Sequence, residues 1–201
     1  IHLEIRAIWS SSAESEPAGY IPQKDIHMPS EPRPAATIII IRETDTGPEV
    51  LMLKRSGRAG FFPNAWVFPG GRVDAADHNN PTIGSTVGIH ANDNAFAVAA
   101  IRETYEEAGI WLGEGNPDPE FRKALNQRTA TLQDSDLVAD LSRLALWSWW
   151  VTPAVEPKRY DTRFFITLLT RDEVQDVRCD EVETVEHRWI APKQAVSEAE
   201  A

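Results

Sequence analysis

The sequence has a single cysteine, Cys179, and no long hydrophobic run in its 201 residues. One cysteine excludes an internal disulfide and a cysteine-rich zinc site, and it fits the reducing cytoplasm. The longest apolar runs, such as "TIIII" at residues 37–41, are far too short to cross a bilayer. No signal peptide is visible, although the chain starts at Ile1 rather than at a methionine. We therefore expect a cytoplasmic protein with no membrane partner.

Positive charge is also scarce. The sequence has 20 lysine and arginine residues and 31 aspartate and glutamate residues, which gives a net charge of −11. This balance argues against non-specific binding to nucleic acid or to an anionic membrane surface. It does not exclude a small anionic substrate, since a bound divalent cation can reverse the local field. The length and the 42% of hydrophobic residues suit one domain with a real core.

The first 35 residues are expected to form an irregular N-terminal arm. Stretches such as "SSSAESEPAG" are rich in serine, proline and glutamate and show no periodicity. Residues 36–201 are expected to form the domain, and its end, "APKQAVSEAEA", starts like a helix that is cut short.

Strands and helices are mixed along the domain rather than strictly alternating, which predicts a mixed sheet flanked by helices. The isoleucine run of the first strand indicates burial on both faces, hence a central position, and a hairpin with the second strand. Pro69-Gly70-Gly71 is interpreted as a turn, residues 72–94 as a polar loop, and Gly109 as the end of the first helix. The predicted strands are residues 36–43, 50–55, 65–68, 147–153, 162–169 and 186–190, and the predicted helices are residues 95–108 and one or two within 119–146.

The first predicted helix carries the segment "RETYEEAGI" at residues 102–110. At about 100° per residue, one stripe forms the expected core face, namely Ala97, Ile101, Thr104 and Ala108. Three carboxylates gather on roughly the opposite side, namely Glu103, Glu106 and Glu107.

Two explanations fit these charges. The helix could be an ordinary solvated one with an ion pair between Arg102 and Glu106, four residues apart. It could instead carry a metal site, because Mg²⁺ takes hard oxygen ligands, typically one or two carboxylates with waters and substrate phosphates. A backbone carbonyl from "FPGG" at residues 68–71 would add another oxygen, and glycine lets the backbone come close.

The two segments together resemble the Nudix box, G-x5-E-x7-R-E-U-x-E-E-x-G-U, where U is an aliphatic residue. Gly71 supplies the first glycine, and residues 102–110 match the second half. The resemblance covers about residues 36–190 and implies an α/β fold, the Nudix-type α/β/α sandwich with a central mixed β-sheet. The implied activity is hydrolysis of a small-molecule substrate, a nucleoside diphosphate linked to another group, by a domain whose relatives often form homodimers.

The box departs from its pattern in three places. Its arginine follows its glycine by 31 positions instead of 14, so 17 residues are inserted. Thr104 replaces the usual aliphatic residue. The first glutamate of the box would fall at Asn94, and the possible substitutes stay open, namely Asp74, Asp77 and Asp93.

The insertion is itself similar to that of one Nudix subgroup, which includes a peroxisomal coenzyme A diphosphatase of animals. This likeness rests on "GGRVDAAD" at residues 70–77 and "WVTPAVEPKRYDTRFF" at residues 150–165. "LMLKRSGRAG" at residues 51–60 also partly resembles a motif of coenzyme A-cleaving members. The implied substrate is coenzyme A or its thioesters. Hydrolysis of ADP-ribose or NADH, and a non-catalytic nucleotide-binding regulator, stay open as alternatives.

The resemblance implies that Mg²⁺ or Mn²⁺ binds the Gly71 carbonyl and the carboxylates of Glu103, Glu106 and Glu107. Glu103 and Glu106 are then catalytic, and Arg102 orients a carboxylate. The general base is open between a box glutamate and the later residues Glu181 and Glu183.

Substrate contacts are expected from Gly70 and Gly71 and from scattered basic residues. The candidates for anionic groups such as a 3′-phosphate are Arg55, Arg58, Lys158 and Arg159. Trp147, Trp149 and Trp150 could stack on adenine, but aromatics of a strand are more often core, and alternation places Trp147 and Trp149 on one side.

Overall fold

The structure of the protein is a computed structural model that describes residues 30–58 and 62–199. The predicted arm therefore lies outside the described residues up to residue 29, and so do residues 200 and 201 of the predicted domain. Strand β1 (Arg33–Thr44) begins three residues before the predicted boundary. Its first residues are paired with two other strands, which local composition does not reveal.

A seven-stranded sheet forms the centre of the molecule, in the order β10-β2-β1-β9-β8, with β3 paired to β2 and β4 paired to β1. β1 runs parallel to β9 and antiparallel to β2 and β4, so the sheet is mixed, as predicted. The other members are β2 (Gly47–Arg55), β3 (Trp66–Val67), β4 (Gly70–Arg72), β8 (Ala145–Val151), β9 (Tyr160–Leu169) and β10 (Thr184–Ile190).

The central position predicted for the isoleucine strand is confirmed, because β1 lies between β2 and β9. Ile38 and Ile40 are fully buried on one face, and Ile39 and Ile41 are half-buried on the other. The predicted hairpin with β2 is also present.

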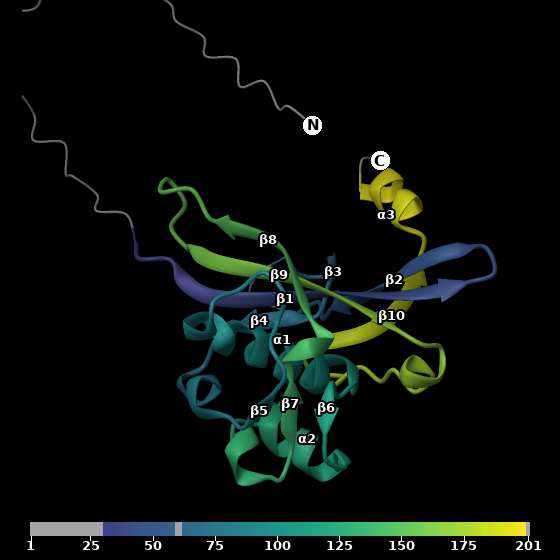
Figure 1. Ribbon diagram of the computed structural model, residues 1–201. Coiled ribbons are helices and arrows are strands. Elements are labelled where there is room, and N and C mark those ends of the chain that lie inside the picture. Colours follow the sequence, from purple (N-terminus) through teal and green to yellow (C-terminus); the bar gives the residue numbers. More distant parts are fainter. Residues whose placement is uncertain (1–29, 59–61, 200–201) are drawn as a thin grey trace, which may run out of the picture.

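Three helices flank the sheet, namely α1 (Asn94–Ala108), α2 (Pro119–Asn126) and α3 (Pro192–Ala199). Figure 1 shows α1 on one side of the sheet with α2 farther out, and α3 on the other side near β2. The helix predicted at residues 95–108 is confirmed, and Gly109 ends it in the left-handed conformation (φ 73°). Among the described residues, no helix combines the length and the apolar content that crossing a bilayer requires.

Only the first part of residues 119–146 is helical, so the prediction there is wrong beyond α2. The chain continues through η3 (Leu132–Asp134), β7 (Val138–Asp140) and η4 (Leu141–Arg143). Asp134 accepts hydrogen bonds from the backbone and the hydroxyl of Thr131. Such local side-chain bonds compete with helix formation. The apolar positions of this segment are nevertheless buried, namely Leu132, Leu137, Leu141 and Leu144.

The Pro-Gly-Gly turn and the polar loop also need correction. Gly70 and Gly71 belong to strand β4, which pairs with β1. The sequence did not predict this strand, because glycine has a weak preference for strands and the pairing partner is distant in the chain. The predicted loop contains η1 (Ala75–Asn79), η2 (Ala91–Asp93) and β5 (Thr82–Ile83). β5 pairs with β7, which also pairs with β6 (Gly113–Glu114), to make a second, three-stranded sheet. A last 3₁₀ turn, η5 (Asp172–Val174), precedes β10.

The three clustered tryptophans are not core residues. Trp147, Trp149 and Trp150 are 67%, 59% and 69% exposed, because β8 is an edge strand with a bulge between Leu146 and Ser148. None of the three lines either of the cavities described below.

Candidate active site

Helix α1 lies close to the sheet because its buried stripe is built mainly from small residues. The four residues of the predicted core face, Ala97, Ile101, Thr104 and Ala108, are all fully buried. The opposite face is not solvated either, since Arg102 is 6% exposed and Glu107 is 4% exposed. The explanation of these charges as a solvated surface helix is therefore wrong.

The glycines of β4 meet the carboxylates of α1. The Gly70 backbone N–H donates to Oε2 of Glu107 over 3.0 Å. A Cβ on Gly71 would lie only 2.4 Å from the carboxylate carbon of Glu103. Glycine at position 71 is thus required for the carboxylate to lie against the backbone.

Arg102 holds the acidic cluster together, because each of its five N–H groups has an acceptor. Nε and Nη2 donate to the two oxygens of Asp77 over 2.9 and 3.0 Å. Nη1 donates to Glu103 and Glu106, and Nη2 also donates to the carbonyl of Arg72. Arginine is the side chain suited to such a fork of donors.

Asp77 is the functional residue whose role the sequence left open. It is 2% exposed, within η1, and its bidentate pair with Arg102 spans 25 positions of the chain. It stands six residues after Gly71, which is the G-x5-E spacing of the box counted from the glycine. Counting back from the arginine gave Asn94 instead, because the insertion follows the acidic position.

Burial makes the carboxylates weak acids. It raises the pKa of Glu103 to about 7, against the opposing pull of Arg102 and with the help of the Glu106 charge. Burial likewise raises the pKa of Glu106, and it raises the pKa of Glu107 well above its ordinary value, with the Glu103 charge acting in the same direction. Burial works to lower the pKa of Arg102, but its hydrogen bond to Asp77 and the surrounding carboxylates raise it far above its ordinary value.

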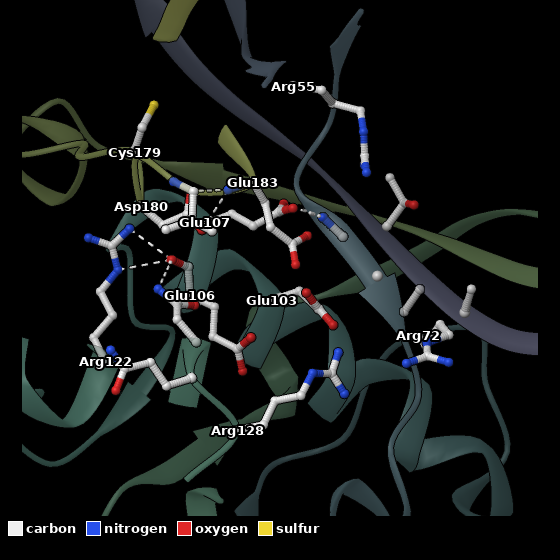
Figure 2. A pocket seen from close by; sticks show the side chains of 18 of the residues that line it. Arg55, Arg72, Glu103, Glu106, Glu107, Arg122, Arg128, Cys179, Asp180 and Glu183 are labelled. Carbon is white, nitrogen blue, oxygen red and sulfur yellow. Dashed lines mark hydrogen bonds between the residues drawn. The ribbon is translucent and has the colours of Figure 1, made fainter. Parts of the chain in front are cut away.

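The carboxylates line a cavity of about 810 Å³ between β1, β4, α1 and α2. Figure 2 shows it with Arg55 reaching in from one side, and Arg72 and Arg128 from another. Arg55 was predicted from the sequence to bind substrate, whereas four further basic residues that line the cavity were not: Arg72, Arg122, Lys123 and Arg128.

The remaining predicted basic residues lie elsewhere. Arg58 lines a second cavity that shares Arg55, Glu181, Val182 and Glu183 with the first, so the two are contiguous. Lys158 and Arg159 line neither cavity, and Arg159 donates to the carbonyls of Thr152 and Ser30.

Arg122 fastens residues 178–184 to the end of α1. Its Nε and Nη2 donate to the carbonyl of Glu106 over 3.0 and 2.8 Å, and Nη2 also donates to the carbonyl of Arg178 over 2.6 Å. At the other end of the loop, the Thr184 hydroxyl donates to the next carbonyl of α1 over 3.1 Å. The loop is therefore fixed against the helix that carries the carboxylates.

This loop presents the two later candidates for the general base to the cavity. Glu181 and Glu183 are exposed and line it. The charge of Glu183 contributes to the raised pKa values of Glu103 and Glu107, so it lies within electrostatic reach of them. Glu181 has a left-handed backbone (φ 64°), which is uncommon for a residue other than glycine.

The donor atoms around Gly71 suit a divalent cation. They are carboxylate oxygens and a backbone carbonyl, the hard ligands that Mg²⁺ and Mn²⁺ prefer. A cation would also offset the buried negative charge that raises the pKa values. Within residues 30–58 and 62–199, no three acidic, histidine or cysteine side chains already surround a common point, since Arg102 and Gly70 engage the glutamates.

Comparison with known proteins relates this site to one family. Residues 80–200 match the sequence profile described as the NUDT19 Nudix domain. The chain is 30% identical to the acyl-coenzyme A diphosphatase NUDT19 of Gallus gallus, with 74% of this chain and 55% of that protein covered. It is 29% identical to the human protein of the same name, with 83% and 63% covered. The chain thus spans little more than half the length of these curated relatives.

A solved structure supports the fold. The chain resembles the crystal structure of a NUDIX hydrolase from Alicyclobacillus acidocaldarius with a TM-score of 0.74 and 28% identity, covering 85% of this chain and 84% of that one. The predicted α/β sandwich with a central mixed sheet is therefore confirmed.

Proposed function

Because the chain belongs to the Nudix hydrolase family, we propose that it hydrolyses the diphosphate bond of coenzyme A or an acyl-coenzyme A. The products would be 3′,5′-ADP and 4′-phosphopantetheine or its acyl form. One observation carries the proposal: Glu103 and Glu107 meet the Gly70–Gly71 backbone at the wall of a cavity that Glu106 and basic side chains also line. We also infer that β1 to α3 make up one catalytic domain.

Mg²⁺ or Mn²⁺ would be held by the Gly71 carbonyl and the carboxylates of Glu103, Glu106 and Glu107. When bound, such a cation would screen the phosphate charge and acidify the attacking water. The chain's own contribution is to keep these oxygens in place. Arg102 does so as a positioning residue, because it binds Glu103 and Glu106 and is itself fixed by Asp77.

Glu183 is the best-supported candidate for the general base. It lines the cavity, its charge acts on Glu103 and Glu107, and its loop is anchored to α1. In this role it would accept the proton of the water that attacks phosphorus. Basic side chains of the cavity would bind the phosphate oxygens, and the second phosphate would leave without a covalent enzyme intermediate.

The choice of coenzyme A rests on the relatives and on the size of the site. Two curated relatives bear the name acyl-coenzyme A diphosphatase. A cavity of about 810 Å³ that continues into a second one gives room for a long substrate. Basic residues within a chain of net charge −11 favour a substrate with several phosphates.

The test is a product analysis with Mg²⁺ or Mn²⁺ and, separately, coenzyme A, acetyl-coenzyme A, ADP-ribose and NADH. We expect 3′,5′-ADP and 4′-phosphopantetheine from coenzyme A, and no products with EDTA. Glu106→Gln and Glu107→Gln should each lower turnover about a hundredfold or more, whereas Glu120→Gln, an exposed glutamate on α2, should not.

Other outcomes would redirect the proposal. AMP from ADP-ribose or NADH alone would keep the metal-dependent mechanism and overturn the substrate. Full turnover in both glutamate variants would refute the metal site. Nucleotide binding without any cleavage would favour a non-catalytic regulator.

A further inference from the structure

Three cationic side chains besides Arg55 and Arg122 line the cavity. Arg72 comes from β4, Lys123 from α2, and Arg128 from the turn that follows α2. Figure 2 shows the guanidinium groups of Arg72 and Arg128 both directed into the cavity, on the side of Glu103 that faces away from Arg55. Arg72 and Arg128 therefore face one region of the cavity, and Lys123 lines the same cavity.

The described residues provide these cations with few partners. The side chains of Arg72 and Lys123 form no hydrogen bond or ion pair with any residue in the described ranges. Arg128 has one ion pair, a long contact of 3.7 Å to Asp74, and its side chain is 65% exposed. Structural arginines such as Arg102, by contrast, use their donors within the protein. Arg72 and Lys123 are thus free to bind an anion, and Arg128 is held only by its long ion pair and by the nearby charge of Glu106.

Arg128 is placed over the cavity by an unusual backbone. Its φ is 56°, and the turn is closed by hydrogen bonds from Arg128 N to Leu125 O and from Thr129 N to Ala124 O. Glycine or asparagine normally occupies this position after a helix, because the left-handed conformation costs other residues about 1 kcal/mol. A long cation held there at such a cost is consistent with a role in the cavity.

The other part of the wall has a different character. Arg55 and Arg58 lie beside Glu181 and Glu183, with Val182 and Val185, along the two contiguous cavities. Their positive charge is offset by the two glutamates, and the valines add apolar surface. This region suits an uncharged, partly apolar chain better than an isolated phosphate.

We propose that Arg72, Lys123 and Arg128 form a separate anion site that binds a phosphate carried on the ribose of the substrate. The inference rests on the proposed function, in which the diphosphate lies against the carboxylates of α1. Such an anion site also fixes the orientation of the substrate. The nucleoside end then lies near β4 and α2, and the other arm of the substrate follows the second cavity, along Arg55 and Val185. The ligand is therefore a nucleoside diphosphate derivative with an additional ribose phosphate.

The test compares substrates that differ only in that phosphate. kcat/KM is measured for coenzyme A and 3′-dephospho-coenzyme A, and for NADPH and NADH, with the wild-type chain and with Arg72→Gln and Arg128→Gln. The wild-type protein should prefer the phosphorylated member of a cleaved pair on the order of a hundredfold, and each variant should lower that preference about tenfold. Preference for coenzyme A assigns the site to a 3′-phosphate, and preference for NADPH assigns it to a 2′-phosphate.

Arg171→Gln is the matched control, because Arg171 is similarly exposed (58%), has one long ion pair, 3.5 Å to Asp45, and lines neither cavity. It should leave the preference unchanged. Equal wild-type rates for both members of a cleaved pair would overturn the anion site. Variants that lower both rates by the same factor would also overturn it, since a misfolded or diphosphate-binding site does not distinguish the two substrates.

A binding measurement separates this proposal from the proposed function. If no substrate is cleaved, titration calorimetry with 3′,5′-ADP and with AMP still reports on the anion site. We expect 3′,5′-ADP to bind about tenfold more tightly or better, with the difference reduced in Arg128→Gln. Equal affinities for the two nucleotides would refute the site.

Discussion

Replacing Glu103 by glutamine should stabilise the metal-free protein while it removes activity. The pKa of this carboxyl group is raised by burial to about 7 from an ordinary value of 4.5. At 1.36 kcal/mol for each tenfold change in proton affinity, this corresponds to about 3 kcal/mol of folding free energy lost once the group is ionised. Glutamine has nearly the same shape, and its carbonyl oxygen can still accept the Arg102 hydrogen bond.

The effect should depend on pH in one direction. The folded state binds the Glu103 proton more tightly than the unfolded state, so no penalty exists below pH 4.5, and it grows as the pH rises toward 7. Above pH 7 the penalty is complete. Urea unfolding in EDTA should therefore give similar stabilities for both proteins at pH 4.5 and a variant more stable by about 1–3 kcal/mol at pH 8.

A variant that is destabilised equally at all pH values would refute this reasoning, because the ion pair with Arg102 would then outweigh the burial of Glu103. Adding Mg²⁺ gives an internal comparison. It should stabilise the wild-type protein more than the variant, since the variant lacks one ligand.

Three further substitutions test how the site is built. Gly71→Ala puts a methyl group within 2.4 Å of a glutamate carboxylate, so turnover in steady-state assays should fall about a hundredfold. Asp77→Asn breaks a fully buried ion pair with Arg102, which should lower the free energy of unfolding in urea by about 3 kcal/mol. Arg122→Gln weakens the link between α1 and the following loop, so kcat should fall about tenfold with little change in KM and with an altered pH profile.

Each of these has its own control. The far-ultraviolet circular dichroism spectrum of Gly71→Ala should match that of the wild-type protein, and normal turnover would contradict the close packing of β4 on α1. Unchanged stability of Asp77→Asn would mean that the other acceptors of Arg102 suffice. Asn126→Ala removes a bond to the same carbonyl of α1 without touching the loop, so an identical kinetic effect would show that the loop is not the cause.

The sequence was sufficient for the elements that carry their own local signal. The isoleucine strand, the helix from residue 95 and its glycine end follow from periodicity and capping, and all three are present. The resemblance of Gly71 and residues 102–110 to the Nudix box was sufficient to predict the family and the fold. The side chains gathered on α1 also followed from helical geometry, although their near-complete burial did not.

Other features depend on contacts between distant segments. β4 is a strand only because β1 lies beside it, and its glycines have little intrinsic preference for that conformation. The leucines after α2 have helix-like spacing, but serine and aspartate side chains bind the backbone there and favour 3₁₀ turns. The exposed tryptophans of β8 follow from its position at the edge of the sheet, which no local pattern gives.

The basic wall of the cavity could not have been predicted from the sequence either. Arg72 precedes Lys123 and Arg128 by about fifty positions in the chain, and the three line one cavity only through folding. Lys158 and Arg159, which looked equally suitable, lie on the connection between β8 and β9 instead. Whether a basic residue can bind substrate is therefore decided by its place in the fold and by its partners among the described residues.

The pair between Asp77 and Arg102 also explains how the box can tolerate an interruption. It acts as a non-covalent cross-link that closes a loop of about 25 positions at its base. The entropic cost of closing a flexible loop rises only about 0.6 kcal/mol for each doubling of its length. Loop closure therefore places little constraint on the length between these two residues, and related chains can differ in length there outside β5, which pairs with β7. A search pattern with a fixed gap would overlook such chains, whereas one with a variable gap after the sixth position would find them.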